Sequence, residues 1–311
     1  MSRLITLLLA VCGGGLLVAQ TGSSISLDQQ IGNKIRGFQG KVSLFAMNLD
    51  TGASYGVSPD DPVPTASTIK LAIMTECFYE AEHGKLNWDE KLKLTNKEKE
   101  GGTGIMQELS EGDEFPIRDL MHLMIVISDN TATNLILNRI GGNAVNARMA
   151  SLGLTQTRVM RKILEGGANP KPQGVTAEGL KPENKKFGFG RTSPHEMVRL
   201  LTLLYRGELV SKSASAEMLE VMKRQRDHNC IGRDMKDTVI ASKSGSLDHL
   251  RSDVGIVYSK RGPIAMAITV NDMPEINYTA DNSGDLLISA LSEILVDRLG
   301  TTVRPTSGPA H

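Results

Sequence analysis

Three short polar motifs could together carry acyl-transfer chemistry, and the first is the S-x-x-K pattern at Ser67 and Lys70. Residues three apart share one face of a helix, so the Lys70 amine can reach the Ser67 hydroxyl. A serine hydroxyl is a weak nucleophile until a base takes its proton, and a lysine whose pKa is lowered by burial or by nearby cations can serve as that base. Taken alone the pattern is weak, because Ser67 fits a helix N-cap equally well.

The second motif, Ser128-Asp129-Asn130, follows the apolar run 120–127 and precedes another helical segment. Polar residues at such a place need partners, so they either cap the helix or line a pocket. Capping by Ser128 or Asp129 is the simpler interpretation of this motif alone.

The third motif, Lys243-Ser244-Gly245-Ser246, ends the strand-like segment 239–242. Lys243 would hold a substrate carboxylate and lower the proton affinity of neighbouring hydroxyls. Gly245 would let a substrate backbone lie against the strand edge. An ordinary lysine beside a turn is the alternative for this motif alone.

The three motifs occur together in the order S-x-x-K, S-D-N and K-S-G. This is the signature of class A β-lactamases and penicillin-binding proteins, with Ser244 in place of a threonine. Over about residues 30–299 the chain resembles class A β-lactamases and their serine-hydrolase relatives. Segment 123–134 is similar to the family's core helix junction, and 253–257 to the strand beside the third motif. Segment 102–105 looks like the loop that closes one side of the cleft.

The resemblance implies a serine β-lactamase that hydrolyses the β-lactam amide through an acyl-enzyme. Ser67 would be the acylated nucleophile, and Lys70 would help to deprotonate it. Ser128 would pass a proton to the β-lactam nitrogen. The backbone N–H groups of Ser67 and Ser246 would form the oxyanion hole.

The resemblance also implies a set of substrate-binding residues. Asn130 would bond the substrate side-chain amide, while Lys243 and Ser244 would bind its carboxylate. Arg251 is a candidate second carboxylate contact, although it does not align cleanly with the family arginine. The whole set is Asn130, Lys243, Ser244, Gly245, Ser246 and Arg251.

Removal of the acyl group needs a further residue, which in class A enzymes is a glutamate with a bound water on a long loop. Matching 157–161 to the family places Ile163 where that glutamate would fall. Glu183 is the first candidate for the general base, followed by Glu165 and then Glu178. The alternative is that all three are solvated loop carboxylates. Without a base the enzyme would acylate and stall.

Hydrophobic periodicity predicts strands at both ends of the chain and helices between them. The fold class is therefore α/β (α+β), with an antiparallel five-stranded sheet formed by both chain ends and flanked by helices. An all-helical lobe, about residues 67–207, is inserted in it. The predicted strands are a hairpin over 41–57 and the segments 239–242, 253–259 and 264–270. The predicted helices are 67–82, 117–127, 132–140, 144–152, 195–205 and 281–299, with a long loop over 166–190.

Composition narrows the ligand class. Lys+Arg and Asp+Glu both number 35, so no basic field attracts nucleic acid or anionic lipid. The six histidines form no HExxH motif and there is no CxxC, which argues against a metal, and no cofactor is implied. We expect a monomer with a small-molecule β-lactam substrate. A D-alanyl-D-alanine carboxypeptidase or esterase of the same fold, and an inert penicillin-binding sensor, remain alternatives.

The N-terminus resembles an export signal. Residues 1–20 combine a positive start with a short apolar run and a small-residue cleavage site, which indicates secretion or export to a bacterial periplasm. A non-cleaved anchor and a lipoprotein anchor at Cys12 are the alternatives. The mature chain is then expected to have no stable membrane insertion, two buried free thiols at Cys77 and Cys230 rather than a bridge, and a disordered tail over 300–311.

Overall fold

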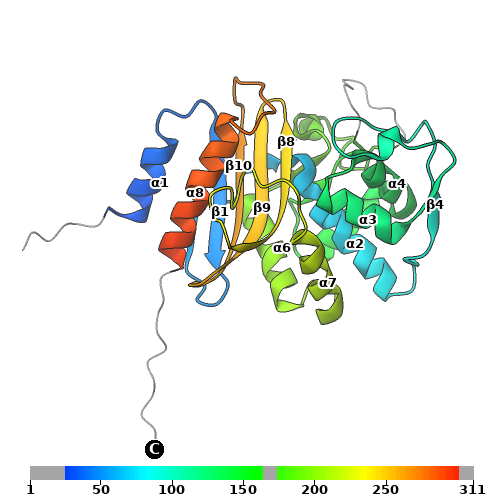
Figure 1. Cartoon of the computed structure of the whole chain (residues 1–311), viewed down its shortest axis with the longest axis horizontal. Helices are drawn as coiled ribbons and strands as arrows, with labels where there is room; N and C mark the ends of the chain where they lie inside the picture. Colours follow the sequence, from blue (N-terminus) through cyan, green and yellow to red (C-terminus); the bar gives the residue numbers. More distant parts are fainter. Residues whose placement is uncertain (1–24, 164–173, 301–311) are drawn as a thin grey trace, which may run out of the picture.

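The computed structural model describes residues 25–163 and 174–300. Its centre is a five-stranded antiparallel sheet with strand order β2-β1-β10-β9-β8 (Figure 1). The beginning of the chain supplies two strands and its end supplies three. They are β1 (Lys41–Asn48), β2 (Ser54–Val57), β8 (Val239–Leu247), β9 (Leu250–Ser259) and β10 (Gly262–Asn271). The prediction of one sheet built from both chain ends is confirmed.

Helices cover both faces of this sheet, so its central strands β9 and β10 are buried on both sides along most of their length. Helices α1 (Leu27–Ile35) and α8 (Ser283–Leu299) lie together on one face (Figure 1). Helix α6 (Pro194–Arg206) packs against β1 and β10 on the other. The sheet thus separates a smaller apolar core under α8 from a larger one that extends into the remaining helices.

The remaining helices form the part of the molecule beside β8 (Figure 1). Helix α2 (Lys70–Glu82) is its centre, with every residue from 70 to 78 buried, as expected for a helix surrounded by others. Around it lie α3 (Ile117–Val126), α4 (Asn130–Ile140), α5 (Gly142–Ser151) and α7 (Lys212–Met222).

Short elements connect these parts. A three-stranded sheet joins β3 (Val63–Pro64), β7 (Gly190–Thr192) and β6 (Arg158–Val159), and a two-stranded one joins β4 (Lys91–Lys93) and β5 (Glu114–Pro116). The 3₁₀ turns are η1 (Ala66–Ile69), η2 (Met106–Glu108) and η3 (Pro182–Phe187).

Two of the differences from the predicted boundaries concern the motifs. The helix expected from Ser67 begins as the 3₁₀ turn η1 and becomes α-helical only at Lys70. The third motif lies inside β8 rather than at its end, because residues 243–246 pair with β9 despite their polar side chains. Helices α1 and α7 were not predicted.

Other expectations concern the termini and the cysteines. The expected signal peptide, Cys12, Glu165 and the tail beyond Gly300 lie outside the described residues. Cys77 and Cys230 are free buried thiols, as predicted, and they lie in different apolar cores. Within the described ranges, no helix combines the length and hydropathy needed to cross a bilayer.

Candidate active site

Ser67 lies in η1, where strand β8 approaches the start of α2. In a 3₁₀ turn residues three apart eclipse one another, so Ser67 and Lys70 project from the same side. The preceding residue, Ala66, has φ 45°, in the left-handed region that non-glycine residues avoid. A Cβ on Gly245 would lie 2.7 Å from the Ser67 backbone nitrogen, so only glycine allows β8 to approach this closely. The backbone is thus held in a strained geometry beside the serine, which is typical of active sites.

The Lys70 ammonium is fully buried and bonded to the second motif. Its Nζ donates to the Ser128 carbonyl at 2.7 Å, to Ser128 Oγ at 3.0 Å and to Asn130 Oδ1 at 3.0 Å. These contacts use all three donors of an ammonium. Burial, with the nearby charge of Lys243, holds the pKa of Lys70 well below its usual range, while Asp129 opposes this shift. A neutral amine at this position can accept a proton.

Asp129, not Ser128, caps helix α4. Its Oδ1 accepts from the Ala132 backbone N–H at 2.8 Å, and its Oδ2 accepts from the N–H groups of Ile105 and Met106 at 2.7 and 2.9 Å. The Ser128 hydroxyl is therefore left available to Lys70. Ser128 itself has φ 58°, a second strained backbone in the site.

The segment before η2 wraps over this motif. Thr103 Oγ1 donates to the Ser128 carbonyl at 2.7 Å, and the Asn130 backbone N–H donates to the Thr103 carbonyl at 3.1 Å. Asn130 Nδ2 donates to the Gly101 carbonyl at 2.8 Å. Gly104 lies so close to Asp129 that a Cβ would be 2.2 Å from its Oδ2. This loop therefore fixes the orientation of the Asn130 amide.

Lys243 is the second fully buried amine. Its Nζ donates to the Ser244 carbonyl at 2.7 Å. Burial lowers the pKa of Lys243 to about 8, although the carboxylates of Asp227 and Asp253 act in the opposite direction. Burial also raises the pKa of Asp253 to about 7, with the charge of Asp227 adding to the shift. The site thus contains two buried ionisable groups, Lys243 and Asp253, near the exposed carboxylate of Asp227.

A single cavity of about 1190 Å³ connects the three motifs. Six of the predicted residues line it, while Lys70 and Lys243 lie behind the wall, in contact with lining residues. The six are Ser67, Ser128, Asn130, Ser244, Gly245 and Ser246. A volume of this size accommodates a small-molecule ligand.

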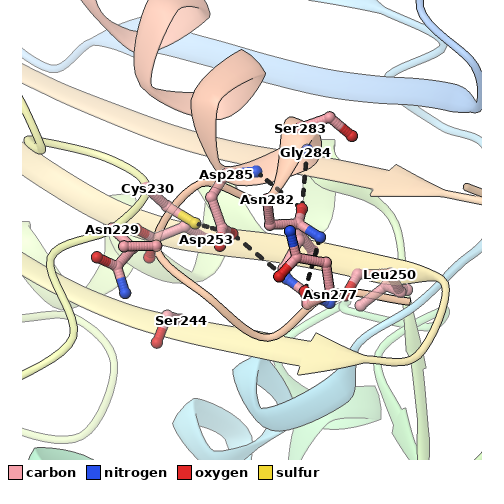
Figure 2. Close-up of polar contacts among 12 residues, drawn as sticks. Asn229, Cys230, Ser244, Leu250, Asp253, Asn277, Asn282, Ser283, Gly284 and Asp285 are labelled. Carbon is pink, nitrogen blue, oxygen red and sulfur yellow. Dashed lines mark hydrogen bonds and ion pairs between the residues drawn. The ribbon is translucent and has the colours of Figure 1, made fainter. Parts of the chain in front are cut away.

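Arg251 lies elsewhere, contrary to its predicted role. Its side chain is buried on β9, where Nη1 donates to the carbonyls of Leu247 and Leu250, both at 2.6 Å, and Nη2 to that of Asn277. Nε lies 3.5 Å from Asp285 Oδ1. Figure 2 shows Asp285 at the start of α8, beside the thiol of Cys230. The guanidinium thus links the loop that carries Asn277 to α8. Because these groups bind it, it does not line the cavity.

None of the candidate bases that the structure describes lines the cavity. Glu183 is exposed on η3. Glu178 accepts from Lys181 Nζ at 2.8 Å and from Asn184, and the bond to Lys181 lowers the pKa of its carboxyl. Glu165 lies outside the described residues.

Ile163 lines the cavity instead, with a side chain that is 7% exposed. Asn134 fixes its backbone with two bonds: Asn134 Nδ2 donates to the Ile163 carbonyl at 2.8 Å, and the Ile163 N–H donates to Asn134 Oδ1 at 2.9 Å. The segment that carries Ile163 is thereby attached to α4, one turn beyond Asn130.

Two residues of the site were missed by the sequence analysis. Asn134 lies four positions after Asn130 on one helix face, a spacing that could have identified it. Asp227, whose Oδ2 accepts from Ser244 Oγ at 2.7 Å, lies in a loop after α7 with no motif around it. In the described part of the chain, no group of three or more His, Cys, Asp or Glu side chains could hold a metal ion.

The comparisons with known proteins agree with this geometry. The sequence model of the Beta-lactamase enzyme family matches residues 26–299. The chain belongs to this family. A β-lactamase from Sphaerobacter thermophilus shares the fold, with 24% identity, a TM-score of 0.76 and coverage of 88% of this chain and 97% of that one. The protein PBP-A shares 28% identity with a TM-score of 0.73, covering 87% of this chain and 94% of its own.

Curated relatives carry the same family name. β-Lactamase L2 of Stenotrophomonas maltophilia is 21% identical over 276 residues, which is 86% of this chain and 85% of that protein. β-Lactamase SME-1 of Serratia marcescens is 26% identical over 149 residues, and this match spans only half of that protein's length.

Proposed function

We propose that this chain is a serine hydrolase that β-lactams acylate on Ser67, and that its acyl-enzyme breaks down slowly. The observation that supports acylation is the bonding of buried Lys70 to Ser128 and Asn130 at the wall of the cavity that Ser67 lines. The observation that supports slow breakdown is Ile163 at the position where the family would place a glutamate.

Acylation follows from these groups. Neutral Lys70 takes the proton of Ser67 as Oγ attacks the carbonyl carbon of the ring. As the C–N bond breaks, Ser128 gives its proton to the ring nitrogen and regains one from Lys70, to which it is bonded at 3.0 Å. The backbone N–H groups of Ser67 and Ser246 carry the negative charge that develops on the carbonyl oxygen. Because the pKa of Lys70 is lowered, the reactive neutral form is present at lower pH than for an ordinary lysine.

Deacylation needs a base that activates water beside the ester. Between residues 157 and 189, the described residues that line the cavity are Arg161, Ile163 and those at 186–189, none of which is acidic. Among the described residues of this segment, none offers a carboxylate that could take the proton of a water beside Ile163. A leucine-to-glutamate variant of the PBP-A relative forms an acyl-enzyme complex with penicillin G, which supports acylation by a β-lactam.

A β-lactamase with rapid turnover is the second candidate, which the relatives named β-lactamase favour. With its base on the 157–189 side of the cavity, it requires a carboxylate from outside the described residues, and Glu165 is a predicted source.

A chromogenic cephalosporin separates the two candidates. We expect a burst of about one equivalent of product per enzyme followed by slow turnover, and intact-protein mass spectrometry should show the added mass. Ser67→Ala should abolish both signals, while the control Ser54→Ala, on an exposed residue of β2, should keep them. Rapid turnover without a burst would refute slow deacylation, and an unchanged reaction in Ser67→Ala would refute the whole assignment.

A further inference from the structure

The end of the cavity expected to bind a substrate carboxylate already holds a carboxylate. Ser244 Oγ donates to Asp227 Oδ2 at 2.7 Å. The other oxygen, Oδ1, accepts from the Asn229 backbone N–H at 3.2 Å, which orients the group. Asp227 and Ser244 both line the cavity. Ser244 lies on β8, and Figure 2 shows it on the strand beside Asn229, Cys230 and Asp253.

This arrangement opposes the binding of an anion. A hydroxyl has one proton to donate, and that of Ser244 is engaged by Asp227. A substrate carboxylate beside Ser244 would meet the negative charge of Asp227 at close range. Neither expected cation reaches the surface of the cavity, because Lys243 is 0% exposed and Arg251 is 2% exposed and bonded elsewhere.

Carboxylates outnumber cations on the loops around Asp227. On the loops after α7, β8 and β10 the cavity is lined by one arginine and three carboxylates, together with a histidine whose Nδ1 contacts the Met273 carbonyl. These residues are Arg226, Asp227, Asp248, Asp272 and His249. This end of the cavity is therefore suited to a group that donates hydrogen bonds.

We propose that Asp227 determines specificity. It favours acyl donors whose leaving group donates a hydrogen bond, through an uncharged amide or a protonated amine. It disfavours acyl donors whose leaving group ends in a carboxylate. The inference rests on the proposed acylation of Ser67. An amide N–H or an ammonium bonds directly to Asp227. A carboxylate binds only after Asp227 has moved away from Ser244 or has been protonated.

Three matched thioesters test this inference. Each carries the same N-acylglycyl group, and the leaving thiols are thioglycolate, its amide and 2-(dimethylamino)ethanethiol, whose protonated amine carries one N–H. Attack by Ser67 breaks the C–S bond, and the released thiol is read with a thiol-reactive dye during the first turnover. Each rate is divided by the rate of hydrolysis of the same thioester in buffer, which removes differences in intrinsic reactivity.

We expect the full-length protein to react with the amide and dimethylaminoethyl esters at least about fivefold faster than with the thioglycolate ester. In Asp227→Asn, which keeps an oxygen acceptor for Ser244, this ratio should fall to about 1, mainly because the thioglycolate ester reacts faster. Labelling by a fluorescent penicillin, which also carries a carboxylate, should become faster as well.

The control is Asp248→Asn, which removes a charge from the same cavity at a carboxylate bonded to Tyr278 rather than to Ser244. It should keep the wild-type order of the three esters. A wild-type preference for the thioglycolate ester, or an order that Asp227→Asn leaves unchanged, would overturn the inference while Ser67-dependent cleavage still supports the proposed function. Absence of Ser67-dependent cleavage of all three esters would overturn both.

Discussion

Replacing Ile163 by glutamate should convert a stalled acyl-enzyme into one that turns over. The side chain lines the cavity, and its backbone is fixed by the 2.8 and 2.9 Å bonds to Asn134, so the new carboxylate should point where the isoleucine does. A correctly placed general base accelerates a reaction by about 10²–10⁴-fold. We expect the rate of deacylation in Ile163→Glu to rise within this range.

The substitution also costs stability. Ile163 is 7% exposed, and burial of a side chain of this size contributes about 1.5–3 kcal/mol. The free energy of unfolding should therefore fall by a few kcal/mol at most, because the carboxylate faces the cavity and remains partly hydrated. Thermal melting shows whether the variant is still folded at the temperature of the assay.

The assay is the lifetime of the acyl-enzyme. The protein is labelled with penicillin, the free ligand is removed, and the loss of the added mass is followed by intact-protein mass spectrometry. Ile163→Gln has nearly the same shape without a base and should stay stalled, and so should Ile163→Leu. If the glutamate and glutamine variants are both folded and lose the label equally slowly, the role assigned to this position is wrong.

Three further substitutions test other parts of the site. Glu183→Gln should leave the acyl-enzyme lifetime unchanged, since this exposed carboxylate does not line the cavity. An acyl-enzyme that lives longer than that of the wild type would show that Glu183 is the base. Asp253→Asn should stabilise the protein at pH 8 but not at pH 4, as measured by urea denaturation. Burial raises the pKa of Asp253 to about 7, so the native state loses stability as the pH rises from about 4 to 7, by at most about 4 kcal/mol. Stabilisation that is equal at both pH values would contradict this account. Gly104→Ala should lower the melting temperature and slow penicillin labelling, because its Cβ would lie 2.2 Å from Asp129 Oδ2 at a φ of +102°. Wild-type labelling in this variant would show that the loop does not position the second motif.

The sheet and the grouping of the three motifs around one cavity were predictable because their signals are local. Alternating apolar residues predicted the strands at both ends, and the motif spacings named Ser67, Ser128 and Lys243. In contrast, no pattern within Ser128-Asp129-Asn130 shows which residue caps α4 and which one contacts Lys70. These roles depend on the backbone N–H groups of Ile105 and Met106, which bind Asp129. The 3₁₀ turn at η1 likewise follows from the close contact with Gly245.

Arg251 and Asp227 show why charged residues are harder to assign. An arginine near the third motif was a reasonable candidate for a carboxylate contact. In the structure its side chain is instead buried on β9, beside the carboxylate of Asp285. Asp227 comes from a loop after α7, a helix that was not predicted. The partner of a charged side chain depends on tertiary packing, which sequence spacing alone does not specify.

The two halves of the proposed reaction depend on different parts of the fold. The acylating groups lie on η1, at the junction of α3 and α4 and on β8, and each is fixed by hydrogen bonds or by a close backbone contact. Position 163 belongs to a separate segment that Asn134 attaches to α4. A change at this position can therefore alter deacylation while the acylating groups stay in place. It follows that the S-x-x-K, S-D-N and K-S-G motifs indicate acylation only. In our proposal, the residue at 163 determines how long the acyl group stays, and the carboxylate beside Ser244 determines which leaving groups the cavity admits.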